Sequence, residues 1–343
     1  MNNLREDQGV SRGERPFAHT GVRRLFYQSP ITKMLKVIYS DEFLDHDTGS
    51  YHPEKPERLT SIVDALKSAE FAHQLTWQLP TPVNDNPSLM NWIEKVHTKT
   101  YIDKVKTIAK NGGGYLDGDT PISPRSYDVA LLAVSAWLDG INSVIKDQQA
   151  AFILARPPGH HAMSSTGMGF CLFSNAAIAA FYALQQPNIN RVAIIDWDVH
   201  HGNGTQFIVD SNPHIAYCSL HQYPAYPGTG KSTETGDHNN VLNIPVYHGS
   251  DISIYQPLWE KKIIPFFTNF KPDLLIVSAG YDALADDPLA GVELQPEDFG
   301  LFTKYCLQIT PNIMFGLEGG YDLSGLAKSV ITTIQSCLTL NYN

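Results

Sequence analysis

The sequence lacks a basic excess, long apolar runs and paired cysteines, and each shortage excludes a class of protein. Among its 343 residues, 35 acidic side chains outnumber 25 lysines and arginines, which gives a net charge of −10. Because no basic excess is available to neutralise phosphates, a dedicated nucleic-acid binder is excluded and cationic substrates are favoured. No apolar run approaches the roughly 20 residues that span a bilayer, so we expect a soluble, cytoplasmic protein without a membrane partner.

The cysteines are few and scattered through apolar segments, without CxxC spacing. The four are Cys171, Cys218, Cys306 and Cys337. This usage is typical of buried free thiols in a reducing compartment. With 43% hydrophobic and 17% charged residues, the composition is that of a folded enzyme and not of a disordered chain.

The first 33 residues differ from the rest of the chain. They combine five arginines with Gly, Ser and Pro and show no sustained hydrophobic period. They contain no apolar core of a secretory signal, and their acidic residues argue against a transit peptide. We predict that residues 1–33 form a flexible N-terminal extension and that residues 34–343 form one domain. Met34, directly before the first strand-like run, is an alternative translation start.

From residue 35 onward, strand-like and helix-like segments alternate. Short apolar runs bounded by turn residues lie at 35–39, 151–155, 192–195, 215–220, 241–246, 274–279 and 313–317. Helical patterns lie at 127–145, 174–184, 255–270 and 296–308. Strands that are apolar on both faces and alternate with helices predict an α/β fold, with a parallel sheet flanked by helices.

The segment IIDWDVHHG at 194–202 starts as a buried strand and ends in two carboxylates and two imidazoles. Placing these side chains in a core is costly unless something binds them. Alternate strand residues share a face, so Asp196, Asp198 and His200 are expected to point the same way. Oxygen and nitrogen ligands suit zinc, with iron or cobalt as alternatives. A buried Asp–His hydrogen-bond cluster without metal is the other interpretation.

Other predicted strands end in equally unusual chemistry. These ends carry RPPGHH at 156–161, His221, GYD at 280–282 and EGGY at 318–321. Since ligands of α/β sheets bind beyond the carboxyl ends of the strands, these groups are expected to meet at one rim. That convergence favours the metal site over the metal-free cluster.

Chemistry alone suggests roles for several of these residues. Asp198, His200 and Asp282 would supply three ligands and leave a position open for water or substrate. Of His160 and His161, one would be the general base, and the other a charged stabiliser or a proton donor. Tyr321, flanked by glycines that let the loop approach closely, would donate a hydrogen bond to a developing oxyanion. The alternative roles are structural: a paired histidine and a partly buried core tyrosine.

These residues carry a resemblance to the zinc-dependent histone deacetylase family, over residues 35 to 335. The matching motifs are PGHH at 158–161, GFC at 169–171, DWDVHHGNGT at 196–205, SAGYD at 278–282, DP at 287–288 and EGGY at 318–321. Asn203 and Glu318 resemble the class II and bacterial branch, which includes acetylpolyamine amidohydrolases. The resemblance implies a single arginase-like domain with a central eight-stranded parallel sheet.

The resemblance also implies roles for the site residues. Asp198, His200 and Asp282 match the zinc ligands, with Fe²⁺ as the alternative metal. His161 matches the general base and His160 the second active-site histidine. Asp196 would accept a hydrogen bond from His160, and Asn203 would orient His161. Tyr321 matches the residue that polarises the substrate carbonyl.

For substrate binding, the resemblance implies that the Gly169 carbonyl accepts the substrate amide N–H, and that Phe170 and Tyr226 form opposite walls of an acyl-lysine channel. Asp119 is either a rim residue that holds the substrate backbone or an ordinary turn aspartate. Leu289 stands where a polyamine-preferring relative has a glutamate, which disfavours polyamines.

Two further features follow from the resemblance. Arg58 would line an internal channel for acetate release or form a structural ion pair. A monovalent cation, K⁺, would be held by oxygens of the residues that surround the strand end. These residues are Asp196, Asp198, Ser219 and, through their carbonyls, His200 and Leu220.

The predicted activity is hydrolysis of N-acetyl groups from lysine side chains of proteins or peptides, or from related amines, by a zinc-bound water with His161 as base. An acetylpolyamine or other small-molecule amidohydrolase is the alternative substrate class. Two rivals are a non-catalytic acyl-lysine binding protein and a two-manganese ureohydrolase. The oligomeric state is not predicted.

Overall fold

The computed structural model describes residues 33–339, and its centre is one parallel sheet. Eight strands lie in the order β2-β1-β5-β10-β9-β6-β7-β8, and every neighbouring pair is parallel. They are β1 (Leu35–Ile38), β2 (Leu75–Gln78), β5 (Ala151–Ile153), β6 (Val192–Asp196), β7 (Ile215–Gln222), β8 (Val241–Val246), β9 (Leu274–Ala279) and β10 (Ile313–Leu317). The predicted α/β architecture with eight parallel strands is confirmed.

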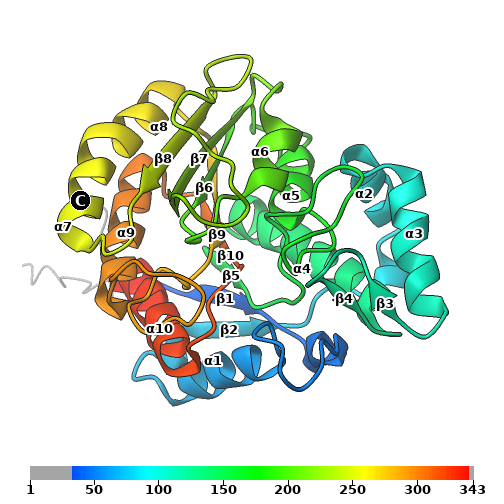
Figure 1. Ribbon diagram of the computed structural model, residues 1–343. Helices are drawn as coiled ribbons and strands as arrows, with labels where there is room; N and C mark the ends of the chain where they lie inside the picture. The colour runs from blue at the N-terminus through cyan, green and yellow to red at the C-terminus, as the bar shows by residue number, and fades with distance from the viewer. Residues whose placement is uncertain (1–32, 340–343) are drawn as a thin grey trace, which may run out of the picture. The chain divides into compact units, whose positions relative to one another are not determined.

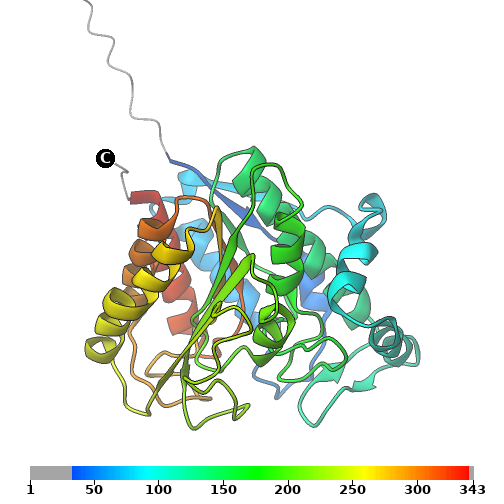
Figure 2. The same cartoon turned by 90° about the horizontal axis from the view of Figure 1, so that it is seen from above.

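Helices cover both faces of this sheet (Figure 1). On one side lie α2 (Leu89–Val96), α3 (Lys99–Lys110), α4 (Ser126–Lys146), α5 (Asn175–Ala183) and α6 (Asn203–Val209). On the other side lie α1 (Glu57–Ser68), α7 (Ile252–Leu258), α8 (Ile264–Phe270), α9 (Pro296–Ile309) and α10 (Leu323–Thr339). Figure 2 shows the sheet from above, between these two layers. A small antiparallel pair, β3 (Gly114–Tyr115) and β4 (Pro121–Ile122), lies apart from it.

The predicted helix at 255–270 is not one regular helix. A π-helical segment, Trp259–Ile263, separates α7 from α8. Pro257 and Pro265 flank this segment and have no N–H to donate. An interrupted ladder of i to i−4 hydrogen bonds favours a local widening of this kind.

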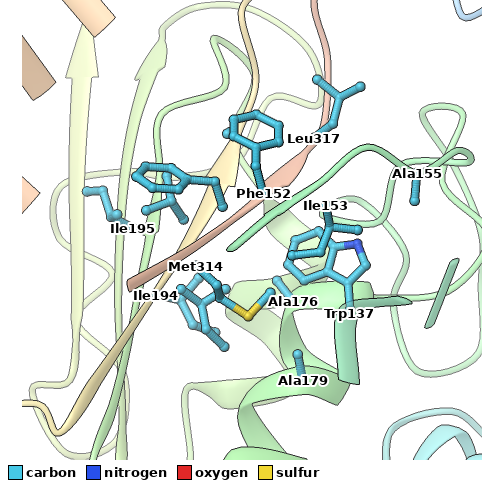
Figure 3. Packing of buried hydrophobic residues seen from close by; sticks show 14 of the residues in the cluster. Trp137, Phe152, Ile153, Ala155, Ala176, Ala179, Ile194, Ile195, Met314 and Leu317 are labelled. Atoms are coloured by element: carbon cyan, nitrogen blue, oxygen red, sulfur yellow. The ribbon is translucent and has the colours of Figure 1, made fainter. Parts of the chain in front are cut away.

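The core lies on both faces of the sheet, against α4 and α5 on one side and against α1, α9 and α10 on the other. Trp137 of α4 packs over Gly316 of β10, where any side chain would collide with the indole ring. Figure 3 shows Trp137 beside Ile153, with Phe152, Met314 and Ile194 in the same buried cluster. The four cysteines are free and buried, as predicted from the sequence.

One helix departs from the expectation that no segment could span a membrane. Among the described residues, α4 is long and apolar enough to do so, with a mean hydropathy of 1.4. However, 78% of this stretch is buried inside the structure, as in the core helix of a folded domain. Residues 1–32 of the predicted flexible extension lie outside the described residues. Its last residue, Lys33, is described and precedes β1.

Candidate active site

Four adjacent strands explain why distant residues meet. β5, β10, β9 and β6 are consecutive in the sheet, so the segments that leave their carboxyl ends are neighbours. Strand β6 ends at Asp196, so Asp198 and His200 lie in the following loop and not on the strand. The argument from strand alternation is therefore wrong for these two residues, although the loop does bring them together.

Asp198, His200 and Asp282 form a compact group whose ligand atoms all lie within 4.8 Å of one another. The Nδ1 atom of His200 lies 3.0 Å from Asp282 Oδ2 and 3.3 Å from Asp198 Oδ1. Burial disfavours the charged imidazole, but the Asp282 and Asp198 carboxylates outweigh it and raise the pKa of His200 well above its usual range. Two buried carboxylates and one imidazole are a donor set that fits zinc.

Backbone amides hold both carboxylates of this group. The N–H of Gly319 donates to Asp198 Oδ2 at 2.8 Å, and the N–H of Val199 donates to Asp282 Oδ1 at 2.8 Å. At Gly280, a Cβ atom would lie 2.1 Å from Asp198 Oδ2, so a residue without a side chain is required there. Burial and the neighbouring Asp198 raise the pKa of Asp282. A bound cation would relieve the repulsion between the two carboxylates.

The two adjacent histidines have different partners. Nδ1 of His160 lies 3.1 Å from Asp196 Oδ2. Burial lowers the pKa of His160, but Asp198 and Asp196 outweigh this and raise it to about 10, which favours the charged imidazolium. Nδ1 of His161 lies 2.8 Å from the neutral side-chain oxygen of Asn203.

His161 is the neutral member of the pair. Burial and the nearby rings of His160 and His200 lower its pKa well below the usual range. Because an amide oxygen only accepts hydrogen bonds, Nδ1 carries the proton and Nε2 has the free lone pair. The arrangement therefore combines a neutral imidazole that can take a proton with a cationic one beside it.

Tyr321 lies on the loop after β10, and its ring contacts a guanidinium group and an aromatic ring. The Arg58 guanidinium lies 5.1 Å from its ring centroid, and the Phe170 ring meets it edge-on at 5.9 Å. Its backbone N–H donates to Asp287 Oδ2 at 2.7 Å. Burial raises the pKa of Tyr321 well above its usual range, so its hydroxyl keeps its proton and can donate a hydrogen bond.

The predicted channel residues gather around His161. A Cβ atom on Gly169, which has φ of +54°, would lie 2.4 Å from the His161 ring and 3.0 Å from that of Tyr226. The Tyr226 ring meets His161 edge-on, with ring centroids 5.0 Å apart. Phe170 also has a left-handed backbone, with φ of +69°, and its N–H donates to Thr120 Oγ1.

Asp119 and Leu289, the other two residues predicted to bind substrate, are exposed. Asp119 lies in the turn between β3 and β4, directly before the Thr120 that binds Phe170, and its carbonyl lies 3.1 Å from His52 Nε2. Burial and the adjacent Asp117 raise the pKa of Asp119. The Leu289 N–H donates to Asp287, the carboxylate that also binds the backbone of Tyr321.

Three of the residues predicted to bind a monovalent cation lie on the neighbouring strands β6 and β7. Asp196 is aligned with Ser219 in the register of β6 and β7, and Leu220 follows on the same strand. Ser219 Oγ lies 2.9 Å from His221 Nδ1.

Arg58 forms an ion pair and also binds the Tyr321 loop. Its Nη1 donates to Glu54 at 3.0 Å, while Nε and Nη2 donate to the carbonyls of Gly320 and Glu318. Glu54 also pairs with Arg156, so two buried cations share one carboxylate. The ion-pair alternative for Arg58 is thus present in the structure.

Two carboxylates near the site were not among the predicted site residues. Glu318 Oε2 accepts the N–H groups of Gly159, at 2.7 Å, and His160, and Oε1 accepts the Ser278 hydroxyl. Asp287 accepts the N–H groups of Tyr321 and Asp322. Both belong to motifs noted in the sequence, but a motif does not reveal which backbone amide a carboxylate will bind.

Comparison with known proteins agrees with this geometry. The family model of the histone deacetylase domain matches residues 52–337. An uncharacterised protein of Synechocystis is 56% identical, over 89% of this chain and 100% of its own. A histone deacetylase-like amidohydrolase of Pseudomonas aeruginosa is 34% identical, over 79% of this chain and 73% of its own. The crystal structure of the HDA15 HD domain superposes with a TM-score of 0.84 at 32% identity, covering 89% of each chain.

Fold and site thus define a hydrolase of the α/β class, with a parallel sheet and a buried carboxylate–imidazole centre. The chain belongs to the histone deacetylase family, whose members hydrolyse acetylated amides.

Proposed function

We propose that this protein is a zinc-dependent hydrolase that removes acetyl groups from lysine side chains of proteins or peptides, or from related amines. The observation that carries the proposal is the meeting of Asp198, His200 and Asp282 with a neutral imidazole, His161. A site built only to bind acyl-lysine would not need a proton acceptor beside a metal-ligand set.

Asp198, His200 and Asp282 would hold the metal, with zinc favoured by their mixed oxygen and nitrogen donors and Fe²⁺ as the alternative. When bound, the metal supplies Lewis acidity, which polarises the substrate carbonyl and makes a water more acidic. We also assign a structural K⁺ to the oxygens of Asp196, Asp198 and Ser219, together with the carbonyls of His200 and Leu220.

His161 takes a proton from the attacking water at Nε2, because its Nδ1 proton is directed at Asn203. The C–N bond of the amide then breaks, and the amine leaves with a proton from one of the two histidines. While the water attacks, the positive charge of His160, paired with Asp196, stabilises the negative charge that develops on the carbonyl oxygen.

Tyr321 donates its hydroxyl proton to a hydrogen bond with the same carbonyl oxygen. The Gly169 carbonyl accepts the substrate N–H, and the rings of Phe170 and Tyr226 enclose the methylene chain. Asp119 holds the backbone of a substrate that extends beyond the opening of the channel, since its turn is linked through Thr120 to the channel wall Phe170. The exposed Leu289 offers no charge to a second ammonium group, which favours acetyl-lysine over acetylpolyamines.

Acetate release from a substrate panel tests the proposal. Zinc-loaded and iron-loaded protein is incubated with acetyl-lysine peptides, acetylputrescine and acetylspermidine, with the H161A variant as control. We expect acetate from the peptides and none from the variant. Acetate from the polyamines alone would reassign the substrate class, and none from any compound would refute the proposed activity.

A further inference from the structure

The loop that carries Tyr226 is fastened to the second histidine of the His200-His201 pair. Thr229 Oγ1 lies 2.7 Å from His201 Nδ1, and His221 Nε2 lies 2.9 Å from the carbonyl of the next residue, Gly230. Both imidazoles are buried, so two rings of the core hold consecutive residues of the loop.

Gly230 shows how closely the loop approaches these rings. Its φ is +84°, and a Cβ atom there would lie 2.5 Å from His221 Nε2 and 2.6 Å from His201 Cγ. The His201 and His221 ring centroids are themselves 4.7 Å apart. Only glycine allows the backbone to lie this near to both imidazoles.

Hydrogen bonding defines the direction of the Thr229 bond. The Gln206 side-chain nitrogen donates to Glu234 Oε2 at 2.8 Å, which turns Gln206 Oε1 toward His201 Nε2, also 2.8 Å away. Because an amide oxygen only accepts, Nε2 of His201 carries the proton and Nδ1 is the acceptor in the neutral ring. The Thr229 hydroxyl is therefore the donor.

Tyr226 depends on this attachment because burial does little to hold it. Its side chain remains 39% exposed, although its ring contacts those of His161 and His200 with centroids 5.0 and 6.2 Å apart. Thr229 follows only three residues later, so a loop released from His201 would let the ring move away from His161.

We propose that His201 is a positioning residue. Through Thr229, it holds the ring of Tyr226 at the distance from the opposite channel wall that the acyl-amine chain requires. The inference rests on the proposed function, in which Tyr226 is a wall of the substrate channel. It assigns a role to the one imidazole of the segment 194–202 that is predicted neither to bind the metal nor to contact the substrate.

The substitutions that test this proposal are made in the loop and not at His201, because His201 is next in sequence to His200, a proposed metal ligand. Thr229→Val removes the hydroxyl that donates to His201, and Thr229→Ser restores a donor. Thr233→Val makes the same change at another exposed position of this loop, away from His201. We measure kcat and KM on an acetyl-lysine peptide, the equilibrium Kd of that peptide, zinc content, and the imidazole ¹⁵N signals of His201.

For Thr229→Val we expect KM and Kd to rise ~10-fold, with kcat and zinc content retained and the His201 signals shifted. Thr229→Ser should recover most of the affinity, and Thr233→Val should match the wild type. Unchanged KM and Kd in Thr229→Val, or a joint loss of zinc and kcat, would overturn the inference. A wild type that binds the peptide but releases no acetate would refute the proposed function instead, and the Kd values would still test the loop attachment.

Discussion

The Nδ1 atom of His161 lies 2.8 Å from the side-chain oxygen of Asn203. His160, the next residue toward the N-terminus, faces the carboxylate of Asp196 instead. An amide partner leaves His161 neutral, whereas a carboxylate partner stabilises the charge on His160. This difference divides the pair into a proton acceptor and a cation.

Asn203→Asp should weaken that division. A carboxylate at this position favours the imidazolium form, so the pKa of His161 rises and the ring is protonated at a higher pH. The acid limb of the kcat/KM profile should therefore move to higher pH, by about one unit. The measurement is kcat/KM against pH for both proteins, and an acid limb at the same pH in both would show that His161 is not the base.

Tyr321→Phe should separate catalysis from binding. Loss of one oxyanion donor typically lowers kcat by roughly 10²-fold or more. Peptide binding should persist, because the ring still packs against Phe170 and under the Arg58 guanidinium. Turnover and Kd are measured in parallel, and nearly unchanged turnover in the variant would exclude the hydroxyl from the reaction.

Glu54→Ala should destabilise the protein strongly. Burial alone would raise the pKa of Glu54, but Arg156 and Arg58 outweigh it and lower the pKa to about 2. Removing the carboxylate leaves two buried guanidinium groups without their shared partner, at a cost of about 3–5 kcal/mol. Urea unfolding measures the change, with the exposed Glu57→Ala as control. Equal stability of the two variants would contradict this account of the ion pair.

His97 should make the protein lose stability in mild acid. Burial lowers the pKa of His97 from 6.5 to about 4, although the Met163 carbonyl opposes this. Its Nε2 already accepts the Ser174 N–H and cannot take a proton without losing that bond. Between pH 6.5 and 4 the unfolded chain binds a proton that the folded chain does not, so stability is complete above pH 6.5 and falls as the pH is lowered.

The contribution of this one ring is about 1.4 kcal/mol per pH unit. The free energy of unfolding of His97→Gln should therefore depend less steeply on pH between 6.5 and 4.5 than that of the wild type. His73→Gln, at an exposed position, is the matched control. A slope in His97→Gln as steep as in the wild type would assign the acid sensitivity to other groups.

Much of the fold was predictable because buried parallel strands appear as apolar runs between turns. The exception is β2, whose sequence LTWQ alternates and whose Trp77 is 36% exposed at the sheet edge. No apolar run marks it, and the eighth strand was expected only from the family resemblance. The break between α7 and α8 was also missed, since the apolar pattern continues through the π-helical segment.

The centre of the site was predictable for a topological reason. Asp198, Asp282 and Tyr321 each lie within four residues of the end of a strand, and these strands are neighbours in the sheet, which brings their ends together. The contacts between Thr229 and His201, and between Glu54 and Arg156, 102 residues apart, depend on how loops pack. No spacing in the sequence encodes such contacts.

The central claim is that Asp198, His200 and Asp282 hold one metal ion that hydrolysis requires. Its most direct test is a titration of metal-depleted protein with Zn²⁺, following acetate release from an acetyl-lysine peptide and bound zinc together, beside Asp282→Ala. We predict no activity without metal, a plateau at one zinc per chain, and neither tight zinc binding nor acetate release in the variant. Full activity in the depleted protein, or a plateau reached only at two ions per chain, would contradict the account.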